Sequence, residues 1–294
     1  MIIGNGIIEA QISEQGAELT GMKRTGRPFE YIWQADAAFW GRHAPMLFPI
    51  VGKVWNGQYQ AGGGSYPMSQ HGFARDSRFS VLNAAGDSVT LVLESDAGTL
   101  KKYPFPFRIE AEYRVTDCSL EASWRVVNTG SGEMFFQIGA HPGFNLPDHD
   151  PADYIHGYFR LLSDGEPVRS LIVGKLTPDG YRADEAGLMS LDTDAMLPVT
   201  SGLFSADALV LEEHQTDCVE LYDKYGNRLL SLECPCAPVW GLWSPPAKNA
   251  PFVCIEPWQG RCDAAGYSGD ISGRDYICSL PAGSTYSFDY RITV

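Results

Sequence analysis

Short segments in which apolar and polar residues alternate recur along most of the chain, and this pattern most constrains how it can fold. Successive side chains of a β-strand point to opposite faces of a sheet, so alternation predicts strands with one buried face. Glycine, asparagine and aspartate separate these segments at intervals of about ten residues, as in sandwiches and barrels. No segment keeps a helical period over three turns. The chain is therefore predicted to be all-β, as one large antiparallel domain spanning residues 1–294.

The strands predicted from alternation are 7–12, 16–23, 29–33, 88–94, 107–115, 119–127, 208–211, 218–222, 228–232, 252–256 and 286–294. An apolar run at 134–138 predicts one further buried strand. Residues 97–102 and 184–190 are each predicted to form a short helical turn. The segment 148–203 is rich in proline, glycine and aspartate, and it is predicted to form irregular excursions around one end of the domain.

Charge and apolar content narrow the class of partner. The net charge of −14 argues against nucleic acid and anionic membranes, because a polyanion would be repelled. No run reaches the roughly 18 apolar residues that a membrane span needs. The start Met1–Gly4 also lacks the basic and apolar regions of a signal peptide. A cytoplasmic protein that binds a small molecule is expected, and these patterns do not predict its oligomeric state.

The seven cysteines are an odd number and are scattered over a chain that is not small. Free thiols in a reducing cytoplasm are therefore predicted. Cys234-Pro235-Cys236 places two of them close together, but no second pair and no histidine pair stands at zinc-finger spacing. We therefore predict no metal site.

The segment Gly139–Pro147 is the first candidate for chemistry. The predicted strand 134–138 leads His141 into a turn whose Pro142 and Gly143 fix the backbone. Histidine can give or take a proton near neutral pH. A single histidine at a turn fits a structural role equally well, so its function depends on what else converges on it.

Three further segments carry polar residues at the ends of apolar runs. His43–Lys53 is an apolar run punctuated by prolines that ends in a lysine, and Tyr66–Arg75 contains His71. Phe252–Gly260 is a buried-looking strand that carries Glu256, and a carboxylate there is costly unless it is paired or functional. Aromatic residues near these segments offer flat faces on which sugars stack, although a core role is the default for most aromatics: Phe73, Phe144, Trp240, Trp243 and Trp258.

Four ordered motifs resemble the aldose 1-epimerase (galactose mutarotase) superfamily, and especially its branch of LacX-type proteins. The motifs are Pro45–Gly52, His71–Arg75, His141–Phe144 and Glu256–Gly260. The likeness runs from about Trp40 to the C-terminus. It implies a β-supersandwich with a sugar site on its concave sheet, and interconversion of the α and β anomers of an aldose without metal or cofactor.

The resemblance also implies roles for single residues. His141 resembles the family's general acid, which protonates the ring oxygen, and Glu256 resembles its general base, which takes the proton of the anomeric hydroxyl. His71 resembles a second histidine that donates a hydrogen bond to the sugar, and Asp207 resembles an aspartate that holds sugar hydroxyls. The aromatic rings of Phe144 and Trp258 are also expected to contact the sugar. Either Lys53 or Arg75 is expected to be the cation that binds its hydroxyls.

Acid and base acting together suit hemiacetal opening, because they avoid a free alkoxide. A protonated histidine beside an ionised glutamate is the expected pairing.

Alternative functions stay open at this point. Epimerisation of a hexose 6-phosphate would need a basic cluster, and only Arg42, Lys53, Arg75 and Arg78 accompany the motifs. A non-catalytic sugar-binding module would need no matched acid and base, and a glycosidase usually needs two carboxylates.

Overall fold

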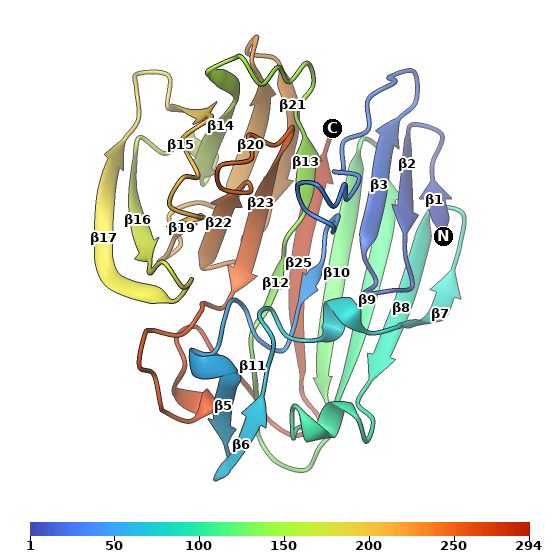
Figure 1. Cartoon of the computed structure of the whole chain (residues 1–294). Helices are drawn as coiled ribbons and strands as arrows, with labels where there is room; N and C mark the ends of the chain where they lie inside the picture. Colours follow the sequence, from blue (N-terminus) through green and yellow to red (C-terminus); the bar gives the residue numbers. More distant parts are fainter.

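The structure is a computed structural model that describes residues 1–294, and β-strands make up nearly all of its regular elements (Figure 1). The first strands are β1 Ile2–Gly4, β2 Ile8–Ile12, β3 Leu19–Arg24, β4 Met46–Leu47, β5 Gln58–Ala61, β6 Gly64–Pro67, β7 Ser80–Ala84, β8 Ser88–Glu94, β9 Phe107–Thr116, β10 Ser119–Asn128, β11 Met134–Phe136, β12 Ile138–Ala140 and β13 Gly143–Asn145. The later strands are β14 Ile155–Ser163, β15 Glu166–Pro167, β16 Ser170–Leu176, β17 Arg182–Ser190, β18 Met196–Thr200, β19 Leu209–Leu211, β20 Cys218–Asp223, β21 Arg228–Glu233, β22 Val239–Trp243, β23 Phe252–Gln259, β24 Cys278–Leu280 and β25 Thr285–Thr293. Short 3₁₀ turns are η1 Trp55–Gly57, η2 Ala74–Asp76, η3 Thr99–Lys101 and η4 Ile271–Gly273, and no helix has the length and apolar character needed to cross a bilayer.

Two large antiparallel sheets dominate the molecule. The ten-stranded sheet has the order β15-β14-β20-β21-β25-β10-β9-β8-β7, with β18 also paired to β14. The eight-stranded sheet has the order β17-β16-β19-β22-β23-β12-β4, with β13 also paired to β23. Figure 1 shows the β16–β17 hairpin at one side of the molecule and the small β1–β2–β3 sheet at the other. The predicted all-β, antiparallel fold is confirmed.

The main core joins the two large sheets. Its buried members include Trp124 and Phe288 from the ten-stranded sheet and Val253 and Ile255 from the eight-stranded sheet. Alternation along the strands explains why one face of the ten-stranded sheet joins this core, since β9 and β10 bury every second residue along most of their length. In β23 both faces are buried, and Glu256 and Trp258 lie on the face away from the main core. The eight-stranded sheet can therefore carry a site on its outer face.

Most strands predicted from alternation are present within two or three residues, and the turn predicted at 97–102 appears as η3. The exceptions occur where alternation is weak. Residues 29–33 form only isolated bridges, and the helical turn predicted at 184–190 is wrong because those residues belong to β17. The prediction of irregular excursions over 148–203 is also wrong, since β14 to β18 lie there. The sequence signal failed because β17 buries none of its residues and therefore shows no apolar face.

The apolar run that leads to His141 is two strands rather than the single one predicted. β11 pairs with β24, whereas β12 pairs with β4 and β23 of the eight-stranded sheet. Gln137 lies between the two strands and is completely buried. Its side-chain oxygen accepts from the Val51 N–H, and its amide group donates to the Arg261 and Asp275 carbonyls. This buried amide lets the chain change sheets without leaving backbone groups unpaired.

His71 and Gly72 are held by a tight backbone contact. Both have a positive φ, of 65° and 72°, and Gly72 forms a parallel bridge with Phe48. A Cβ on Gly72 would lie 2.1 Å from the carbonyl oxygen of Phe48. Glycine is therefore required there for its conformation and for its size.

We expect Gly72→Ala to lower the free energy of unfolding by about 2–4 kcal/mol, because it adds a steric clash to the cost of a positive φ. The matched control is Gly57→Ala, since Gly57 has a φ of 70° and open space around it. That control should lose only about 1 kcal/mol. Urea unfolding measures both, and equal losses would show that the contact with Phe48 imposes no constraint.

Candidate functional site

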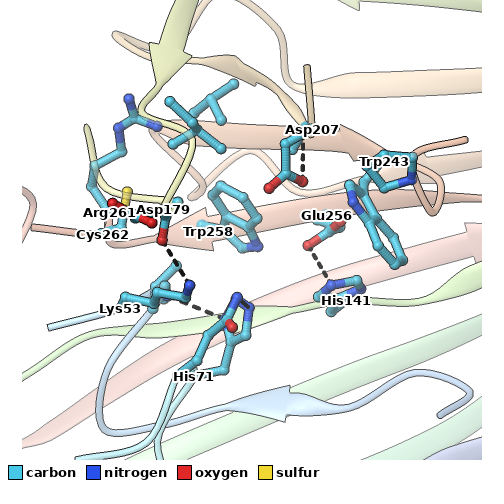
Figure 2. A pocket seen from close by; sticks show the side chains of 18 of the residues that line it. Lys53, His71, His141, Asp179, Asp207, Trp243, Glu256, Trp258, Arg261 and Cys262 are labelled. Atoms are coloured by element: carbon cyan, nitrogen blue, oxygen red, sulfur yellow. Dashed lines mark hydrogen bonds and ion pairs between the residues drawn. The ribbon is translucent and has the colours of Figure 1, made fainter. Parts of the chain in front are cut away.

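A cavity of about 360 Å³ opens over strands β22 and β23 of the eight-stranded sheet. A volume of this order is that of a small-molecule site. Figure 2 shows side chains from distant parts of the sequence converging on it. The predicted site residues that line the cavity are Lys53, His71, Arg75, His141, Asp207, Glu256 and Trp258.

His141 and Glu256 meet inside this cavity. His141 directly follows β12 and Glu256 lies in β23, and these two strands are neighbours in the sheet. The Nε2 atom of His141 lies 3.2 Å from Oε2 of Glu256 (Figure 2). Only 8% of His141 and 1% of Glu256 is exposed. The two groups are therefore in contact at an ion-pair distance, although Oε2 of Glu256 accepts no aligned hydrogen bond.

Burial disfavours charge on both members of this pair. Burial, followed by repulsion from Asp207, raises the pKa of Glu256 well above its usual range. Burial and the nearby positive charges of Arg75 and Arg42 lower the pKa of His141 to about 3. Both pKa shifts favour the neutral forms, which departs from the expected pairing of a protonated histidine with an ionised glutamate. These directions place a proton on the Glu256 carboxyl rather than on the His141 ring, whose Nε2 lies 3.2 Å from it.

Two tryptophans fix the orientation of the His141 ring. The Nδ1 atom of His141 is buried and has no hydrogen-bond partner. The indole of Trp40 stacks on the ring at 4.8 Å between centroids, and Trp243 meets it edge-on at 5.6 Å. Histidines in functional sites are usually oriented by a hydrogen bond to the second nitrogen. Here aromatic packing takes over that role, and Trp40 had carried no sequence signal for it.

His71 has a defined tautomer. The Gly52 N–H donates to its Nδ1 atom at 3.1 Å, so Nδ1 carries no proton and Nε2 does. Protonation of Nδ1 would break this bond. Burial and the neighbouring His141 lower the pKa of His71 well below its usual range. His71 is therefore a neutral residue whose Nε2–H faces the Gln70 side-chain amide at 3.2 Å, and the amide oxygen accepts from it once the amide group is turned over.

Asp207 and Trp258 flank Glu256. Asp207 lies in the turn before β19, and its Oδ1 accepts from the Ala208 N–H, which leaves the other carboxylate oxygen for a ligand. The ring of Trp258 lies flat against the backbone of both neighbouring strands. A Cβ on Gly139 or on Gly241 would lie 2.6 Å from this ring. Gly139 in β12 and Gly241 in β22, the two strands that flank β23, thus make the space for an apolar floor beside the carboxylates.

Three cations line the cavity, and each already has a partner in the protein. Lys53 Nζ donates to the Asp179 carbonyl at 2.7 Å (Figure 2). Arg75 donates to the Gln70 carbonyl, and Arg261, which sequence analysis missed, lies 3.2 Å from Glu212. Arg261 sits just past the Glu256–Gly260 motif and is 1% exposed. Its ion pair with Glu212 is not an aligned hydrogen bond, so the Nε, Nη1 and Nη2 atoms of Arg261 are buried without a hydrogen-bond partner.

Phe144 requires a correction, because it does not reach the cavity. Its ring is completely buried in the main core. In the pairing of β13 with β23, Phe144 stands directly opposite Val253, and residues in register share one face of a sheet. Val253 faces the main core, so Phe144 does too. Its place beside His141 in the sequence says nothing about the face on which it lies.

His141, Cys254 and Glu256 are the one group in the chain whose donor atoms are arranged to hold a metal ion, within 4.8 Å of one another. A histidine nitrogen, a thiolate and a carboxylate are ligands that suit Zn²⁺. Burial and the Glu256 carboxylate raise the pKa of Cys254 well above its usual range, so a metal would first have to displace the thiol proton. The absence of a metal requirement stays a prediction.

Comparison with known proteins places the chain in a family. The family model described as aldose 1-epimerase matches residues 1–264. Protein LacX of Lactococcus lactis subsp. lactis, in its plasmid form, is 27% identical over 99% of this chain and 97% of its own length. A galactose mutarotase-like protein from Lactobacillus casei superposes with a TM-score of 0.91 at 31% identity, over 100% of this chain and 99% of that one. A galactose mutarotase related enzyme from Lactobacillus acidophilus gives 0.90 at 33%, over 100% and 96%. With its motifs, antiparallel fold and cavity in agreement, the chain belongs to the aldose 1-epimerase family.

Proposed function

We propose that this protein is a mutarotase that interconverts the α and β anomers of a free aldohexose. One observation carries the proposal: a histidine and a glutamate lie side by side in a buried cavity, with 3.2 Å between Nε2 and Oε2. The reaction requires a proton to leave the anomeric oxygen while another reaches the ring oxygen. Both oxygens are bonded to the same carbon, so an acid and a base that lie close together suit them.

The proposed cycle keeps one proton on the pair throughout. In the first half, Glu256 takes the proton of the anomeric hydroxyl and His141 protonates the ring oxygen, which opens the ring to the aldehyde. The aldehyde group rotates about the bond between C1 and C2. In the second half, Glu256 returns a proton to the new anomeric oxygen, and His141 removes the proton from the attacking hydroxyl. His71 donates to the sugar, and Asp207 accepts from its hydroxyls.

Burial helps this cycle because it brings the two states of the pair closer in energy. The state before opening has charged His141 and charged Glu256, while the state after opening has both neutral. Burial disfavours the two charges, and their attraction across 3.2 Å favours them. The opposing effects keep the proton transfer close to balanced, which a reaction that runs in both directions requires.

The cations of the cavity favour an uncharged sugar over a hexose phosphate. A phosphate needs donors that are free to bind it, commonly from arginine. Lys53 and Arg75 each donate to a backbone carbonyl, so Arg261, whose Nη atoms have no hydrogen-bond partner, is a single free guanidinium rather than the cluster of cations that a phosphate favours. The Lactobacillus relatives are described as like or related to galactose mutarotase, so galactose is the first sugar to test.

We expect the purified protein to accelerate the change in optical rotation of freshly dissolved α-galactose or α-glucose. Glu256→Gln and His141→Asn should each lower this rate by about 10²–10⁴-fold, because each removes one proton-transfer group. Polarimetry measures the rate, and the spontaneous rate in buffer is subtracted.

The matched control is Glu220→Gln, which removes another buried carboxylate, in β20 of the opposite sheet. It should keep the wild-type rate. Wild-type protein that does not exceed the buffer rate on any aldose would favour a non-catalytic sugar-binding module. Acceleration of hexose 6-phosphates alone would favour the phosphate-specific alternative.

We expect Asp207→Asn to move the high-pH limb of the rate profile to lower pH. The negative charge of Asp207 raises the pKa of Glu256, so its removal makes the pair release its proton at lower pH. The charge-conserving control Asp207→Glu should keep the limb near the wild-type position. A limb that does not move in Asp207→Asn would show that Asp207 does not act electrostatically on the pair.

We expect metal chelators to leave the mutarotation rate unchanged, since histidine and glutamate supply both proton transfers. The measurement is the polarimetric rate before and after dialysis against a strong zinc chelator. Loss of activity on dialysis, with recovery on adding Zn²⁺, would instead assign a catalytic metal to His141, Cys254 and Glu256.

A further inference from the structure

Two cysteines meet in the turn between β21 and β22, and neither lines the sugar cavity. The Ala237 N–H donates to the Cys234 carbonyl at 3.1 Å, which closes a turn with Pro235 at its second position. The Sγ atoms of Cys234 and Cys236 lie 3.5 Å apart. A rigid turn thus holds two thiols in contact.

The two thiols differ in their access to solvent. Cys236 is exposed, whereas Cys234 is completely buried. Among the other five cysteines, Cys118 is half-buried and the rest are buried. No other pair of sulfur atoms in the chain lies within hydrogen-bond distance. The turn therefore combines the one exposed thiol with a second thiol directly beneath it.

The two thiols also differ in acidity. The hydrogen bond from the Cys234 thiol lowers the pKa of Cys236 to about 7. Burial raises the pKa of Cys234 well above its usual range. An accessible thiolate is the reactive form of cysteine towards oxidants, and a neighbouring thiol can then resolve the product.

We propose that Cys234 and Cys236 form a redox site that a small neutral hydroperoxide oxidises to an intrachain disulfide. The Cys236 thiolate attacks the peroxide, the O–O bond breaks, and Cys236 becomes a sulfenic acid while the peroxide leaves as water or an alcohol. The Cys234 sulfur then attacks the Cys236 sulfur and displaces water. In total, two thiols lose two electrons and two protons, and the hydroperoxide is reduced by the same two electrons.

The surroundings of the turn favour a neutral oxidant. A hollow of about 360 Å³ borders Pro235, and its lining includes the carboxylates of Glu121, Glu233 and Asp289 against the single cation of Arg291. This charge repels anionic oxidants such as glutathione disulfide. Closing the bond requires the sulfurs to move from 3.5 Å to about 2.05 Å, the length of a disulfide bond.

The test treats the fully reduced protein with hydrogen peroxide near neutral pH, then alkylates the remaining thiols and maps the peptides by mass spectrometry. The peptide that contains Cys234 and Cys236 should lose two hydrogens, escape alkylation, and recover both thiols after dithiothreitol. These thiols should react about ten times faster in the native chain than in the urea-unfolded chain, because a lowered pKa gives more thiolate. Equal rates in the two states would overturn the proposal.

Three variants separate this site from general thiol oxidation. Cys234→Ser should stop at a sulfenic acid on Cys236 that dimedone traps. Cys236→Ser should remove the fast reaction entirely. Cys118→Ser, which changes the next most accessible thiol, should behave as the wild type. Fast disulfide formation that survives in Cys236→Ser, or that disappears in Cys118→Ser, would also overturn the proposal.

Discussion

The contact between the His141 imidazole and the Glu256 carboxylate is the interaction on which the site depends. The two groups come from positions 115 residues apart in sequence, and the pairing of β12 with β23 brings them within 3.2 Å. Sheet hydrogen bonds fix this spacing more firmly than loops would. The same strands carry Gly139 and Trp258 in register, so the histidine–glutamate pair and the apolar floor of the cavity share one scaffold.

Burial sets the pKa values of both groups in this contact. Trp40 and Trp243 pack around His141 and Trp258 lies beside Glu256, so little of either group is exposed. Such surroundings disfavour charge on either group, and in the proposed cycle one proton moves between them as a bound sugar opens and closes. His71 stays neutral beside them and contributes a fixed hydrogen-bond donor.

Much of the fold and part of the site could be predicted from the sequence. Alternation located most strands because their partners bury one face, and it failed at β17, which has no buried residue. The motifs indicated His71, His141 and Glu256, which all line the cavity. They misplaced Phe144, because the face of a residue depends on its register with β23. They gave no sign of Trp40 as the support of His141, since no local pattern records a stacking contact across a hundred residues.

The central claim is that His141 and Glu256 act as one unit that carries a single proton. A double-mutant cycle in kcat/KM for mutarotation tests it most directly. If the two groups work only together, the double variant His141→Asn/Glu256→Gln will be about as slow as the slower of the two single variants. If the losses of the single variants multiply in the double variant, each group acts independently, and the account of a shared proton is wrong.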